Sequence, residues 1–238
     1  MSNRGNDVKH SLVRSISILM VAAWPIAAQQ FPVARDGGPP PAEIRVDHEI
    51  LVDNQRLQYI FLDLLHDTGL RGGFVEMAKC SNLPKGRLKI KQGVTVKQAM
   101  NALVAANPGY QWELRDNVVN LMPRGAAPLL HTRIAKFQKD ATDREIGAIL
   151  QDVLNLPEVK RHVASLGLKP GISGIGLWGG EEHPIPKKPV PVHVDLENVS
   201  LQDAFNEILL ASPKGAWIYH ESDCNGEKTF SVEALTDY

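Results

Sequence analysis

Apolar and polar positions in the first half of the chain alternate between the spacing of strands and that of helices. Residues 44–50 alternate apolar with polar side chains, which predicts a half-buried strand. Residues 57–65 carry an apolar stripe at helical spacing, and Gly69 is suited to end that helix. Shorter apolar runs predict strands near 74–77 and 88–90. The first half therefore begins with a strand, a helix and two further strands.

A second helix and a hairpin complete this unit. Thr95 and Gln98 have the spacing of a capping box, and residues 96–104 carry an apolar stripe. Pro108 cannot continue a helix, so the helix is predicted to end near the preceding residue. Residues 110–122 alternate on either side of an Asp-Asn turn, as in a β-hairpin.

The second half repeats this order with one addition. A capping box is predicted for Thr142 with Glu145, and another cap for Ser200 with Asp203. The predicted elements are a weak strand at 131–137, helices at 146–154 and 158–166 separated by Pro157, a strand at 192–196, a helix at 201–209 and a hairpin around Asn225-Gly226.

One stretch occurs twice. VKQAMNALVAANPGYQW at 96–112 returns as LQDAFNEILLASPKGAW at 201–217, with the same helix, stop and aromatic strand. The identical pairs are Ala99/Ala204, Asn101/Asn206, Ala106/Ala211, Pro108/Pro213 and Trp112/Trp217. We predict an α+β fold of two related β-α-β-β-α-β-β modules, at 43–124 and 130–236.

The N-terminus has the pattern of an export signal. Three basic residues precede a short apolar run that ends in small residues, and we expect residues 1–28 to be cleaved. A membrane anchor or a buried helix is the alternative, although the run is short for a span. Residues 29–42 are rich in Pro and Gly and predict a linker. We expect a periplasmic or secreted protein with no stable membrane span after cleavage.

Composition and charge reduce the number of possible functions further. The 238 residues are 43% hydrophobic and 22% charged, which is ordinary for a globular protein. Without residues 1–28 the chain has 23 basic and 26 acidic residues, a formal net charge of −3. Because nucleic-acid binding normally requires a basic surface, we do not expect a nucleic-acid partner.

The only two cysteines, Cys80 and Cys224, lie in different halves. In an exported protein such a pair suggests a disulfide. It would close a long loop and stabilise the fold by ~3–5 kcal/mol in the chain-entropy model. The alternative is two separate thiols, and the spacing does not decide between them.

A Gly- and Pro-rich insertion at 168–191 interrupts the second module. Ile175, Leu177 and Trp178 place apolar side chains in an expected surface loop, and we predict that they bind a partner, with the Trp as anchor. The alternative is a flexible insertion whose Trp packs on its own domain.

Catalytic, cofactor and metal motifs are weak throughout, and we predict no such site. The run GISGIG lacks dinucleotide-binding spacing, and Ser173 lacks the flanking glycine of a nucleophile elbow. Residues 181–183 do not have metal-helix spacing. His193 and Asp195 share a strand face, which suits base chemistry or simply a wet surface. The repeated tryptophans suit packing better than sugar stacking.

Three segments resemble the secretin and TonB short N-terminal (STN) domain, a small periplasmic module. They are LQYIFLDLLHDTGL, IKQGVTVKQAMNALV and YQWELRDNVVNLMP, within residues 44–123. The second module is similar to a diverged copy. The resemblance implies an α+β fold and periplasmic protein partners, and the family has no shared catalytic residues to transfer. No barrel or secretin ring is predicted within these 238 residues.

Together these features predict an exported, non-enzymatic protein–protein interaction module of the bacterial envelope. A small-ligand or glycan-binding protein with a site between the modules is the first alternative. A hydrolase of unknown class is the second. The oligomeric state stays open.

Overall fold

The first half of the chain forms the helices and strands of the predicted first module in the predicted order. The computed structural model describes residues 40–80, 85–125, 127–142, 145–171, 189–212 and 215–235. The first-half elements are η1 (Pro41–Glu43), β1 (Ile50–Arg56), α1 (Leu57–Thr68), β2 (Arg71–Ala78), β3 (Lys85–Ile90), α2 (Val96–Ala106), β4 (Tyr110–Arg115) and β5 (Val118–Pro123).

The second half repeats this order, with two helices where the first half has α1. Its elements are η2 (Pro128–His131), β6 (Arg133–Thr142), α3 (Ile146–Leu154), α4 (Pro157–Ser165), β7 (Leu168–Pro170), β8 (Pro191–Ser200), α5 (Leu201–Leu210), β9 (Gly215–Cys224) and β10 (Glu227–Leu235). The fold is mixed α+β, as predicted.

The predicted helix ends and turns have local causes that the structure confirms. The Thr95 hydroxyl accepts a hydrogen bond from the backbone N–H of Gln98, whose side chain accepts from the Thr95 N–H, so α2 starts with a full capping box. Gly69 ends α1 in the left-handed conformation, with φ 66°. Asn225 and Gly226 both have positive φ in the turn between β9 and β10.

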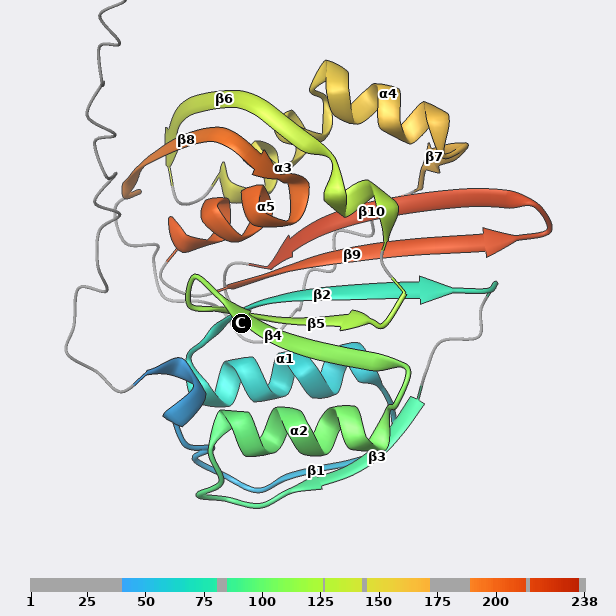
Figure 1. Cartoon of the computed structure of the whole chain (residues 1–238). Helices are drawn as coiled ribbons and strands as arrows, with labels where there is room; N and C mark the ends of the chain where they lie inside the picture. The colour runs from blue at the N-terminus through green and yellow to red at the C-terminus, as the bar shows by residue number, and fades with distance from the viewer. Residues whose placement is uncertain are drawn as a thin grey trace, which may run out of the picture. The chain divides into compact units, whose positions relative to one another are not determined.

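Each half contributes the same two pieces of sheet (Figure 1). β1 pairs antiparallel with β3, and β6 pairs antiparallel with β8. In the first half β4 pairs antiparallel with β5, which runs parallel to β2. In the second half β9 pairs antiparallel with β10, which runs parallel to β7. The duplication seen in the sequence is therefore also a duplication of strand order.

The two three-stranded pieces join into one six-stranded sheet in the order β4-β5-β2-β9-β10-β7. The join is a parallel pairing of β2 with β9, from Arg71 opposite Gly215 to Ala78 opposite Ser222. β2 and β7, which occupy equivalent positions in the two halves, therefore run in opposite directions. Along the sheet, the strands of the second half follow those of the first in the same order. Each strand of the second half runs in the opposite direction to its equivalent in the first, which corresponds to a rotation about an axis that lies in the sheet and crosses the strands.

Because of this turn, the helices of the two halves cover opposite faces of the sheet (Figure 1). Phe74 and Val75 are neighbours on β2 and point to opposite faces. Phe74 lies in a core with α1 and α2, whereas Val75 lies in a core with α3 and α5. Each half therefore closes one face of the shared sheet, and both cores depend on β2 and β9.

Two local expectations differ from the structure. The predicted strand at 44–50 is wrong in position, because β1 covers Ile50–Arg56 and only an isolated bridge joins Arg45 to Thr95. The side chain of Asp67 accepts the backbone N–H of Asp47 and turns the chain before β1. The capping box at Thr142 forms only in part, since its N–H and hydroxyl both donate to Glu145.

No helix among the described residues is long and apolar enough to cross a membrane.

Candidate functional site

The repeated tryptophans make the same hydrogen bond in both halves. The indole Nε1 of Trp112 on β4 donates to the side-chain oxygen of Asn101 on α2 at 2.9 Å. Trp217 on β9 donates to Asn206 on α5 at 2.8 Å. Each Asn lies eleven residues before its Trp, so the same helix-to-strand connection holds each indole. Two equivalent aromatic side chains thus lie at equivalent places on the two hairpins.

In the second half this indole is fully enclosed. Trp217 is 0% exposed, and its ring packs against Phe205 with centroids 5.5 Å apart. Gly73 on β2 lies directly opposite Trp217 in the parallel pairing. A Cβ at Gly73 would overlap the indole ring of Trp217 and the side chain of Asn120. Because Gly73 has no side chain, the indole ring of Trp217 can lie across β2 at this position.

In the first half the equivalent position is open. Trp112 is half-buried, and within the described residues β4 pairs with a strand on its β5 side only. Arg115 and Val118 close the two-residue hairpin, so alternate residues direct their backbone groups outward. These include Trp112 and Leu114, and the Leu114 residue is 37% exposed. The outer edge of β4 therefore combines unpaired backbone groups with apolar side chains.

The second half holds β4 in place. On the sheet face away from Trp112, Arg115 contacts Asp203 of α5 at 2.5 Å, and the Gln202 side chain donates to Glu113 at 2.8 Å. Burial by itself raises the pKa of Asp203. Hydrogen bonds from Ser200 and Arg115 outweigh it, so the pKa of Asp203 lies below its ordinary value. The open edge is thus part of a fixed strand.

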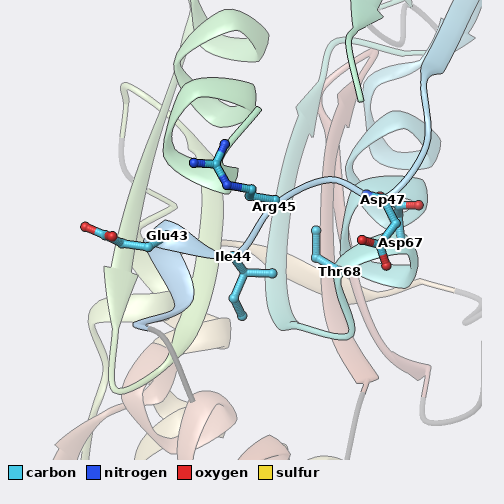
Figure 2. A pocket seen from close by; sticks show the side chains of 6 residues that line it. All are labelled: Glu43, Ile44, Arg45, Asp47, Asp67 and Thr68. Carbon is cyan, nitrogen blue, oxygen red and sulfur yellow. The ribbon is translucent and has the colours of Figure 1, made fainter. Parts of the chain in front are cut away.

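The hollow shown in Figure 2 lies beside the end of α1 and has a volume of about 420 Å³. Its most buried acid, Asp67, has a side chain 3% exposed that accepts the backbone N–H of Asp47 at 2.7 Å. Arg45 points away from Asp47 and Asp67 (Figure 2). It donates to the carbonyl of Gly93 at 2.5 Å. Arg45 and Asp67 therefore bond to different partners, and the polar groups of the hollow do not converge on a common point as they do in a ligand site. We interpret this hollow as structural.

A row of polar side chains crosses the join, from β2 through β9 to β10. Glu76 on β2 is 2% exposed, and its Oε2 lies 3.0 Å from Nδ1 of His220 on β9. Ser231 on β10 is opposite His220, so the row has the residue types of a nucleophile, a base and an orienting acid. Within the described residues, however, the Ser231 hydroxyl is not hydrogen-bonded to His220. The backbone N–H groups of these strands pair within the sheet, so they are not available to stabilise an oxyanion.

Burial shapes the titration of the groups around this row. It raises the pKa of Glu233, and the nearby His220 opposes that rise. Burial also raises the pKa of Tyr110, and the charge of Glu76 adds to the rise. These groups lie on a sheet face, and they do not line either of the two hollows around Asp67. We therefore assign no reaction to the row.

The cysteines lie side by side where β2 and β9 end. Ala78 is opposite Ser222, so Cys80 and Cys224 follow two residues beyond on the same side of the pairing. Both are free thiols in this structure. A hydrogen bond with the Cys80 thiol, together with burial and nearby charge, raises the pKa of Cys224. The structure brings together the two residues of the predicted disulfide, which stays a prediction.

The other residues singled out in the sequence have separate places. The predicted partner-binding residues Ile175, Leu177 and Trp178 lie outside the described residues, as do Ser173 and residues 181–183. His193 does not pair with Asp195, because its Nδ1 lies 2.7 Å from Asp140 on the neighbouring strand β6.

Sequence reasoning missed Gly73 and the two Trp–Asn hydrogen bonds. The equal spacing of Asn and Trp in the two copies was the available signal for the bonds. Among the described residues no group of three or more His, Cys, Asp or Glu side chains is placed to hold a metal ion. In comparisons with known proteins, no family model, curated protein or solved structure matches the chain.

Proposed function

We propose that this chain is an exported protein–protein interaction module of the bacterial envelope, and that it has no enzymatic activity. The open edge of β4 carries the proposal. An unpaired strand edge is a ready template for a strand from another chain, and folded proteins usually shorten, charge or cover it. Here the edge has a half-buried Trp112 and an exposed Leu114, so it offers both backbone groups and apolar surface.

Two further observations support this function over a ligand-binding protein or a hydrolase. The first is that two hollows of the described residues lie beside Asp67 in the first half, whereas the two halves meet in a continuous sheet. The second is the resemblance of residues 44–123 to the STN domain in sequence, which implies periplasmic protein partners. Location in the envelope rests on the signal-like pattern of residues 1–28.

Site-specific photo-cross-linking in the bacterial envelope tests the proposal. Benzoylphenylalanine in place of Leu114 samples the β4 edge, and the same group in place of Leu51, which is 68% exposed on β1, is the matched control. We expect one defined envelope protein, identified by mass spectrometry, to be cross-linked from position 114 and not from position 51. If no protein is cross-linked from either position, the interaction function is contradicted.

A further inference from the structure

The outer edges of β4 and β9 are equivalent, but only one is filled within the described residues. Both hairpins place the Trp backbone groups on the edge away from the hairpin partner, and both indoles bond to the same Asn of the repeat. On β9 this edge pairs in parallel with β2. The pairing of β2 with β9 therefore shows which residues a strand can place beside the Trp of this repeat.

The filled edge shows which residues the added strand needs. Gly73 is opposite Trp217, where a Cβ would overlap the indole ring, so the matching hydrogen bond at Trp112 imposes the same demand for glycine. Two residues further on, Val75 is opposite Tyr219. The equivalent position on β4 is Leu114, whose exposed apolar side chain favours an apolar neighbour.

We propose that β4 binds an extended segment of a protein partner by strand addition. The segment runs parallel to β4, with glycine opposite Trp112 and an apolar residue opposite Leu114. This inference rests on the proposed function and adds the surface, the direction and the chemistry of the bound segment. Backbone hydrogen bonds supply affinity and the glycine supplies specificity.

A second folded copy of this chain does not supply the segment through β2. That strand is already paired on both sides, with β5 and with β9. Two copies meeting β4 edge to β4 edge would place two Trp112 side chains near each other with no glycine between them. The chemistry of the filled edge therefore favours a different protein as the occupant.

Titration of the full chain with a labelled peptide tests the inference. The probe is a capped, fluorescein-labelled peptide with the sequence of residues 70–78, LRGGFVEMA, followed by fluorescence anisotropy. We expect saturable binding, and we expect the peptide with Gly73→Val to bind at least roughly tenfold more weakly because its side chain overlaps the indole.

Two protein variants locate the binding edge. Leu114→Pro removes an outward N–H, and proline is tolerated at a strand edge, so this variant should fold and fail to bind. Leu114→Ala keeps the N–H and should bind. Circular dichroism and the melting temperature verify that both variants fold. If Leu114→Pro is unfolded, Trp112→Ala in a folded protein tests the site instead, since removal of the indole should abolish the preference for the glycine peptide over the Gly73→Val peptide.

A spin label on the peptide reports its direction. In the parallel arrangement a nitroxide at the N-terminus broadens the amide signal of Gln111, and one at the C-terminus broadens that of Arg115. The reverse pattern overturns the parallel arrangement, and unchanged binding by Leu114→Pro or by the Gly73→Val peptide overturns the site. A concentration-dependent dimer abolished by Leu114→Pro would instead assign the edge to self-association, which also overturns the inference.

Failure here is distinguishable from failure of the proposed function. An envelope protein cross-linked from position 51, with no peptide binding at β4, would leave the interaction function standing and reject this edge. No cross-linked protein and no peptide binding would reject both.

Discussion

The two copies of the Trp hairpin share a local structure and differ in their neighbours. Trp112 and Trp217 make equivalent hydrogen bonds, yet Trp217 is fully buried and Trp112 is half-buried. The difference arises from β2, which lies beside β9 and presents Gly73 to the ring. Local sequence therefore fixes the side-chain geometry, whereas the position of a strand within the sheet decides whether that geometry builds a core or offers a surface.

The largest expected effect comes from replacing each tryptophan in turn. Trp217→Ala should lower the free energy of unfolding by about 3–5 kcal/mol, because it empties an enclosed site. Trp112→Ala should cost only about 1 kcal/mol, because this residue is only half-buried. Urea unfolding of both variants measures the difference. Equal losses would mean that Trp112 is as enclosed as Trp217.

A disulfide between the two cysteines should stabilise the pairing of β2 with β9, which fills the edge of β9. Oxidation of Cys80 and Cys224 would tie the ends of β2 and β9 together across a long loop. The melting temperature should rise by about 5–15 °C. The double variant Cys80→Ser/Cys224→Ser is the control and should not respond to oxidant. Intermolecular products in place of an internal bridge would contradict the side-by-side placement.

Much of each half could be predicted from sequence because its causes are local. The cap at Thr95, the stop at Gly69 and the Asn225-Gly226 turn each depend on a few neighbouring residues. The predicted strand at 44–50 was misplaced because a distant carboxylate, Asp67, turns the chain there. A contact of that kind leaves no periodic signal.

The join between the halves could not be predicted for the same reason. β2 and β9 pair residues 144 positions apart, from Arg71 with Gly215 onward, and strand periodicity does not specify a partner at that separation. The sequence identified both tryptophans of the candidate site as a repeated pair. It did not indicate which one the join encloses, because the two copies match at that position.

Filling the space beside Trp217 tests the role of glycine. Gly73→Ala should cost about 1–3 kcal/mol, because the new methyl group overlaps the indole ring. Gly109→Ala is the control, since a Cβ there meets no atom within 4 Å. In the Trp217→Leu background the cost of Gly73→Ala should shrink. If the two costs simply add, the indole ring is not what excludes a side chain from β2.

The smallest effect concerns the ion pair that holds the open strand. Arg115 and Asp203 join β4 to α5, and Arg115→Gln should cost about 1 kcal/mol near neutral pH. Lys89→Gln is the control, because its pair with Glu49 is exposed and should contribute little.

The pH dependence of that loss identifies its cause. Despite the opposing effect of burial, hydrogen bonds hold the folded-state pKa of Asp203 below its ordinary value, so the stabilisation is present above the unfolded pKa of about 4. It is lost as pH falls through the folded value. The difference between the wild-type chain and Arg115→Gln should therefore be constant from pH 7 to about pH 5 and vanish toward pH 2. A difference that persists at pH 2 would show that Arg115 holds β4 by packing of its apolar stem, and the charge on Asp203 would then have no part in fixing the open edge.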